Sequence, residues 1–137
     1  MTDGELMEKV HAAVYRQCQC RGYAAPVDVL MDIGVLTKGK YEDWRLGRVD
    51  YLERVCNVNL RKLSFIMQQI RAYARENGLK PSVTVYKRWS VKKKTRQGHK
   101  SVILLRFSKS GNLEIERRYA THFVDVRSCS HVRDTYD

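Results

Sequence analysis

The sequence lacks an apolar run of the length that a membrane-spanning helix needs, which is about 20 residues. It also does not begin with the basic and then apolar pattern of a secretory signal peptide, since Asp3 and Glu5 stand there. Proline is scarce, with two residues, and 43% of the chain is hydrophobic, which argues against global disorder. We therefore expect a soluble, cytoplasmic protein with no membrane partner.

Motifs of several enzyme classes are also missing. There is no glycine-rich phosphate-binding loop, no G-x-S-x-G nucleophile motif and no H-E-x-x-H zinc motif. The side chains left for catalysis are Glu114, Glu116, His99 and His122. Because Glu114 and Glu116 are two residues apart on a predicted helix, they point in different directions. We expect no enzyme and no cofactor, and a metal-dependent nuclease stays as an alternative.

Cysteine is limited to four residues, and without a signal peptide reduced thiols are expected. Cys56 falls on an apolar stripe and is predicted to lie in the core. Soft sulfurs and an imidazole are ligands that zinc accepts, so a four-residue zinc set is conceivable. That set is Cys18, Cys20, Cys129 and His131. C-x-C is a less usual spacing than C-x-x-C, and we therefore predict no metal.

Acidic residues are absent from one long segment. All fifteen acids lie at or before Glu76 or at or after Glu114, whereas residues 77–113 hold ten Lys or Arg. The net charge of the chain is +11, so the remainder carries only about +1. A near-neutral protein with one concentrated cationic segment is typical of a protein with a polyanionic partner.

Apolar periodicity predicts helices over the first part of the chain, to residue 78. Steps of three and four residues recur over 3–19, and Pro26 suits the first turn of a short helix over 26–34. Thr37 can cap a third helix that Gly47 closes. The Trp44 side chain is predicted to help nucleate the helical core.

A long fourth helix is predicted from Asp50 to Gly78. Asp50 and Glu53 have the spacing of a capping box, and an apolar stripe runs from Leu52 to Ala74. Asn57 and Asn59 are weak helix formers that would allow a break. The stripe must be buried against the other helices or against a second copy, so a homodimer is also a candidate.

After Pro81 the apolar period changes to two. Residues 83–89 and 101–108 are predicted to be antiparallel strands joined by a basic loop, 90–100. Asn112 then caps a closing helix over 113–124, and the tail 126–137 has no clear period. The fold class is α+β within a single domain, 1–137, with a helical part (1–78) and a hairpin-plus-helix part (79–125). This order is winged-helix-like by analogy only, which fixes no function.

The interpretation we favour is a nucleic-acid-binding protein whose basic hairpin contacts phosphates, with DNA favoured over RNA and duplex DNA over other forms. Lysines there would act as point charges, and arginines would make bidentate contacts. Trp89 is predicted to pack in the core, and Tyr86, on the opposite face, to stack on bases. The predicted contact residues are Lys87, Arg88, Lys92, Lys93, Lys94, Arg96, Lys100, Arg106, Tyr86, Arg71 and Arg75.

Two other interpretations of the basic segment stay open. One is a plain solvated hairpin loop, in which lysines discourage edge aggregation. The other is an adaptor or inhibitor that docks the hairpin on an acidic protein partner.

Overall fold

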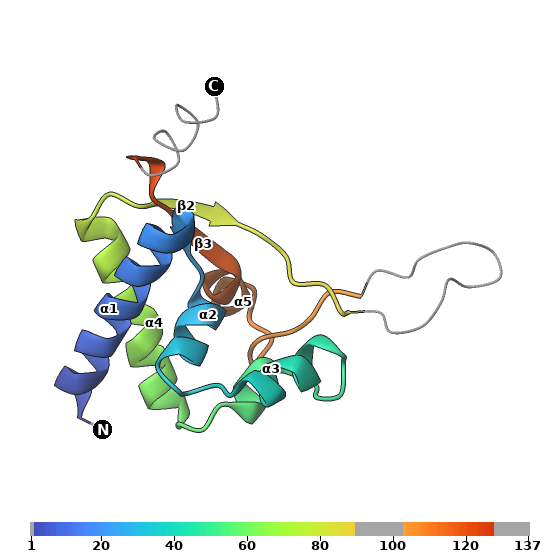
Figure 1. Ribbon diagram of the computed structural model, residues 1–137. Coiled ribbons are helices and arrows are strands. Elements are labelled where there is room, and N and C mark those ends of the chain that lie inside the picture. Colours follow the sequence, from blue (N-terminus) through green and yellow to red (C-terminus); the bar gives the residue numbers. More distant parts are fainter. Residues whose placement is uncertain (1, 90–102, 128–137) are drawn as a thin grey trace, which may run out of the picture.

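The computed structural model describes residues 2–89 and 103–127. In this part of the chain, five α-helices and one 3-10 helix accompany a small three-stranded sheet (Figure 1), so the α+β class is confirmed. The elements are α1 (Asp3–Arg21), β1 (Tyr23–Ala24), α2 (Pro26–Asp32), α3 (Lys38–Arg45), η1 (Leu52–Val55), α4 (Leu60–Glu76), β2 (Lys80–Val83), α5 (Leu113–Ala120) and β3 (Thr121–Val124).

Several helix starts follow directly from the local sequence. Pro26 opens α2, and the Thr37 hydroxyl accepts a hydrogen bond from the Lys40 backbone N–H at the start of α3. The Asn112 side chain likewise accepts from two backbone N–H groups of α5. These caps satisfy donors that have no partner within the helix.

The long helix predicted from Asp50 is wrong in its first part. Residues Leu52–Val55 form the separate 3-10 helix η1, and α4 begins only at Leu60. Asn59 is the N-cap of α4, because its side-chain oxygen accepts from the Lys62 N–H at 2.9 Å. The capping box is also wrong, since the Glu53 carboxylate binds Lys109 and Tyr119 instead.

The sheet has the order β1-β3-β2, and both pairings are antiparallel. Neither the position of β2 nor the existence of β1 and β3 was predicted. The closing helix ends at Ala120 instead of continuing to 124, and β3 pairs with residues 23–24 and 80–83. The predicted strand 83–89 is replaced by β2 at Lys80–Val83, followed by an extended stretch with one isolated bridge.

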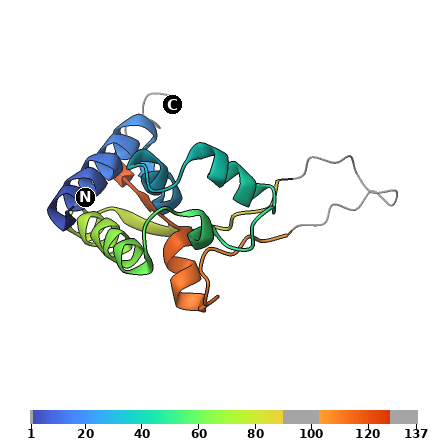
Figure 2. The ribbon, with the colours of Figure 1, turned by 90° about the horizontal axis from the view of Figure 1, so that it is seen from below.

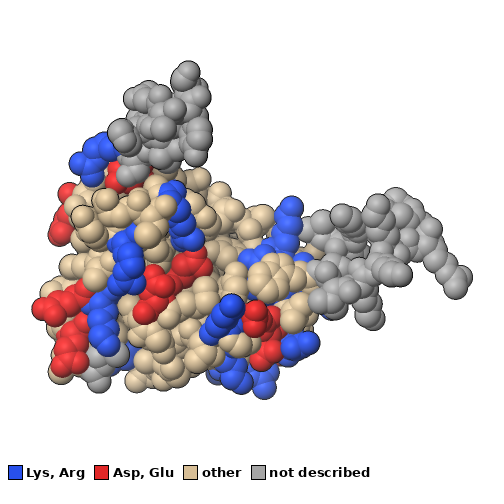
Figure 3. Space-filling model, in the orientation of Figure 1, with Lys and Arg blue, Asp and Glu red and all other residues tan. Residues whose placement is uncertain are grey.

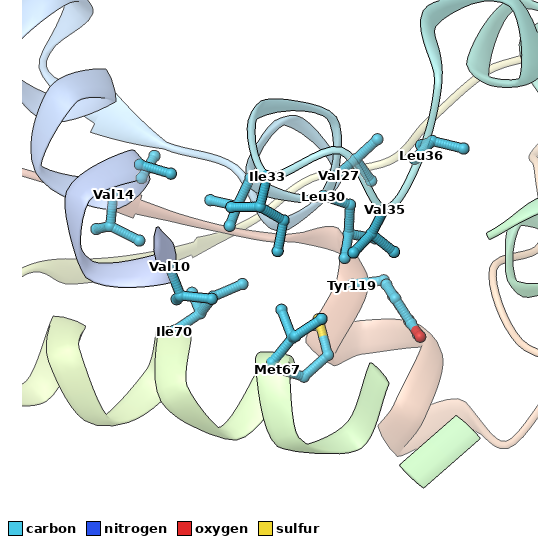
Figure 4. Packing of buried hydrophobic residues seen from close by; sticks show 14 of the residues in the cluster. Val10, Val14, Val27, Leu30, Ile33, Val35, Leu36, Met67, Ile70 and Tyr119 are labelled. Atoms are coloured by element: carbon cyan, nitrogen blue, oxygen red, sulfur yellow. The ribbon is translucent and has the colours of Figure 1, made fainter. Parts of the chain in front are cut away.

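The core lies between α1, α2, α4 and the sheet. In Figure 4, Val10 of α1 lies against Ile70 of α4, and both are fully buried. The apolar stripe of α4 is thus covered within the chain, so burying it does not require a second copy. Residues 128–137, most of the predicted tail, lie outside the described residues. No helix among those described is both long and apolar enough for a membrane span.

Candidate nucleic-acid interface

Two stretches within the acid-free segment lie side by side. We call residues 84–89 and 103–107 the arm base. The Arg88 N–H donates to the Ile103 carbonyl at 2.8 Å, and the Leu105 N–H donates to the Tyr86 carbonyl at 2.9 Å. The two stretches leave the helical body together in both views (Figures 1 and 2). Antiparallel pairing is present here, although not as the two regular strands that were predicted.

Hydrogen bonds attach both stretches of the arm base to the helical body. The Trp89 N–H donates to the Arg45 carbonyl of α3 at 2.6 Å. On the other stretch, the Arg106 carbonyl accepts from the indole Nε1–H of the fully buried Trp44 at 2.8 Å and from the Leu52 N–H at 3.2 Å. The position of the arm base is therefore set by α3 and η1.

Aromatic rings fill the space beneath the arm base. Trp44, Tyr86 and Phe107 are buried, and each pair of their ring centroids is 5.2 to 5.5 Å apart. The Tyr86 hydroxyl is 3.1 Å from Nε2 of His122, and burial raises the pKa of Tyr86 well above its usual range. The prediction that Tyr86 faces outward to stack on bases is therefore wrong.

Trp89 is not the core residue that was predicted. Its side chain is 40% exposed, and the Arg45 guanidinium lies 4.8 Å from the centre of its ring. The same guanidinium lies 5.2 Å from the ring of Tyr86. Arg45 thus joins the two aromatic rings by cation–π contacts and helps to hold the arm base against α3.

The cations of the arm base differ in whether their side chains have a partner within the described residues. Lys87 and Arg88 are exposed, and within residues 2–89 and 103–127 neither pairs with a carboxylate. Arg106 is exposed too, but its Nε–H donates to the Ser108 carbonyl at 3.0 Å and its guanidinium lies over the Tyr51 ring. The other predicted contacts lie outside the described residues: Lys92, Lys93, Lys94, Arg96 and Lys100.

Two carboxylates that sequence reasoning assigned differently fix the end of the arm base. Glu116, considered above as a catalytic acid, accepts from the Phe107 N–H at 2.9 Å and from the Ser108 N–H at 2.7 Å. Glu53 accepts from the Lys109 N–H at 2.9 Å and from the Tyr119 hydroxyl at 2.7 Å. No local sequence signal marks the partners of Glu53, since Lys109 and Tyr119 are each more than fifty residues away from it.

The cations of α4 do not form a uniform basic face. Lys62 and Arg61 approach the Asp3 carboxylate at 2.6 and 3.9 Å, and the hydrogen bond from Lys62 lowers the pKa of Asp3. Arg75 is exposed, whereas Arg71 is partly buried and lines a cleft beside α5. Figure 3 shows basic and acidic side chains interleaved over the face of the helical body that carries α1.

Among the described residues, the structure does not bring together the members of the four-residue zinc set, nor the histidines and glutamates considered for a nuclease. Cys18 is buried and Cys20 is exposed on α1, while Cys129, His131 and His99 lie outside the described residues. Among the residues described, no group of three or more His, Cys, Asp or Glu is placed to hold a metal ion.

The remaining nuclease candidates have structural partners. Glu114 forms an ion pair with Arg118 at 2.7 Å, and Glu116 binds the turn at residues 107 and 108. His122 stacks on the Tyr23 ring, and burial lowers the pKa of its imidazole.

No protein-family model, curated protein or solved structure matches this chain. The chemistry of the residues themselves therefore carries the functional proposal.

Proposed function

We propose that this is a nucleic-acid-binding protein that contacts duplex DNA mainly through the basic segment 84–107. One observation carries the proposal. Two stretches of the acid-free segment, 84–89 and 103–107, are joined by hydrogen bonds at one base, where Lys87 and Arg88 are exposed without a described carboxylate partner. A basic segment anchored in this way can present its charge to a polyanion.

The charge of the segment supports a polyanionic partner over a solvated loop. Lys92, Lys93 and Lys94 are consecutive, and like charges repel at short range. No Asp or Glu of residues 77–113 can neutralise them, because that stretch has none. Phosphates would supply the missing negative charge and would release condensed counterions on binding.

The aromatic residues support a double-stranded ligand over a single strand. Stacking on unpaired bases needs exposed aromatic faces. Tyr86 is buried, and Trp89 is already in contact with Arg45 and Tyr41. The phosphate backbone is then the main feature that the segment can read, so DNA sequence preference should be weak.

The winged-helix analogy enters the proposal only in part. The basic hairpin follows α4, a helix that carries several cations, as a wing follows a recognition helix. However, α1 covers the apolar face of α4, and Asp3 approaches two of its cations. We therefore propose the hairpin as the main contact, with Arg75 and Arg71 in a supporting role.

The test compares two double variants that remove the same charge. Lys87→Gln with Arg88→Gln removes two of the three cations of the arm base, and Lys9→Gln with Arg117→Gln removes two exposed cations outside the acid-free segment. Fluorescence anisotropy with a labelled duplex at fixed salt should show affinity about tenfold weaker for the first variant. The matched variant should bind nearly as the wild type does.

Three results would contradict the proposal. Equal loss in both double variants would mean that net charge alone matters. Tighter binding to single strands than to duplex would contradict the duplex assignment. Saturable binding to an acidic protein that excess DNA does not compete would favour the adaptor interpretation instead.

A further inference from the structure

A cleft of about 670 Å³ lies between α4, α5 and the turn at residues 108–110. Both helices lie on the same side of the molecule in Figure 2, where α4 is green and α5 is orange. Met67, Ile115 and Tyr119 give the cleft apolar walls, and Leu60 at its rim is 53% exposed. A volume of this size is typical of sites that hold small molecules.

Cations outnumber carboxylates around this cleft. Arg71, Lys109 and Arg118 line it, and Glu53 is the only acidic residue among the described residues of its lining. Both oxygens of Glu53 are already engaged, by the Lys109 N–H and the Tyr119 hydroxyl. Arg118 is paired with Glu114, but that carboxylate is 74% exposed, so solvent weakens the pair.

Arg71 is a partly buried cation of this cleft. Within the part of the chain that the structure describes, it forms no ion pair and no hydrogen bond through its side chain. Burial, and then the neighbouring charges of Arg118 and Arg75, lower the pKa of its guanidinium, and the Glu114 carboxylate opposes this shift. An arginine nevertheless stays charged at neutral pH. A partly buried cation beside a second cation favours an anion between them.

The polar side of the cleft is held in a fixed shape. Ser64, Ser108 and Ser110 lie there, and the buried Ser108 hydroxyl donates to the Glu116 carboxylate. The turn that carries two of them is bound by Glu116, through the Phe107 and Ser108 N–H groups, and by Glu53, through the Lys109 N–H. The Gly111 N–H also donates to the Ser108 hydroxyl at 3.1 Å. This turn is therefore positioned before any ligand arrives.

We propose that the cleft binds a small phosphate-bearing molecule with an apolar body. Arg71 and Arg118 would hold the phosphate, with Lys109 and Ser110 at the rim, and the apolar part would lie along Met67 and Ile115. Arg71 is also a supporting residue of the proposed DNA contact, but the site uses no residue of the basic segment 84–107, and it does not depend on the proposed function.

Octyl phosphate and inorganic phosphate are the probes, measured by isothermal titration calorimetry below the micelle concentration of the first. The wild type should bind octyl phosphate more tightly than inorganic phosphate. Arg71→Gln should weaken octyl phosphate binding about tenfold or more, because it removes a charge-assisted contact. The matched control is Arg75→Gln, which removes the same charge from an exposed position of α4 one turn away and should leave binding nearly unchanged.

A second pair guards against an effect on folding alone. Arg118→Gln should weaken octyl phosphate binding, and Arg117→Gln on the exposed side of α5 should not. The Lys92/Lys93/Lys94→Ala variant should bind octyl phosphate as the wild type does, even if it no longer binds DNA. The proposal is overturned if neither probe binds, if inorganic phosphate binds as tightly as octyl phosphate, or if the variants within each pair bind equally.

Discussion

Two glutamates carry much of the specificity of the fold at the scale of single residues. Glu53 and Glu116 each accept two or more hydrogen bonds, and both act on the turn that ends the arm base. Their donors are backbone N–H groups and hydroxyls, which cost free energy when they are buried without a partner. Charged acceptors make these hydrogen bonds stronger than neutral ones.

Replacing Glu116 by Gln should lower the free energy of unfolding by about 1.5–3 kcal/mol, because charge-assisted hydrogen bonds to the turn are lost. Glu114→Gln is the matched control on the same helix. Its carboxylate is 74% exposed and forms an i,i+4 pair with Arg118, so about 0.3–0.5 kcal/mol is expected. Urea unfolding followed by circular dichroism measures both. Equal losses would mean that Glu116 does not hold the turn.

His122 makes the stability depend on pH. Burial lowers the pKa of its imidazole below the ordinary value of 6.5, because a charged ring loses solvation beside the buried Tyr86. As the pH falls through the unfolded pKa toward the lower folded one, the unfolded chain takes up a proton that the folded chain does not. The contribution of His122 to stability is therefore present above pH 6.5 and is lost below it.

Urea unfolding at pH 7.5 and at pH 5.5 checks this dependence. The wild type should be less stable at the lower pH, and His122→Gln should show a smaller difference between the two conditions. An unchanged difference in the variant would assign the pH dependence to other groups.

At the scale of elements, the sequence predicts what local chemistry decides. Pro26, Thr37 and Asn112 start their helices as predicted, because caps act within one turn. The capping box at Asp50 fails because distant partners, Lys109 and Tyr119, take the Glu53 carboxylate. Of the candidate site, only the concentration of positive charge was predictable from the sequence. The anchoring of residues 84–89 and 103–107 on α3 and η1 depends on tertiary contacts.

The strands show the same limit. Ile115, Tyr119 and Phe123 recur every four residues and predict a helix to residue 124, yet residues 121–124 form β3. Pairing of β3 with both β1 and β2 decides this, and those partners lie about forty and a hundred residues earlier in the chain. A periodic pattern does not contain that information.

Gly47, in the turn after α3, gives a prediction for an element boundary. Its φ is +77°, and a Cβ there would lie 2.8 Å from Arg88 Nε. Gly47→Ala should cost about 1–2 kcal/mol, because other residues rarely adopt this backbone conformation. Gly39→Ala, inside α3 and facing open space, should instead gain about 0.5–1 kcal/mol. Thermal or urea unfolding compares the two, and a loss in both would contradict the assignment.

At the scale of the whole molecule, charge is divided between two regions. A nearly neutral helical body carries one segment with ten Lys or Arg and no acid. The body holds that segment at Trp89 and Arg106 through Arg45, Trp44 and Leu52. The fold is thus stabilised by apolar and hydrogen-bonded contacts, and we propose that the basic segment serves to bind a partner.

The salt dependence of duplex binding tests this division most directly. If the segment engages about five phosphates, a plot of log affinity against log salt should have a slope near −4 to −5 in the wild type. The Lys92/Lys93/Lys94→Ala variant should bind more weakly, with a slope shallower by about 2 to 3. Equal affinity and equal slope in the two proteins would contradict the central claim that this segment binds nucleic acid.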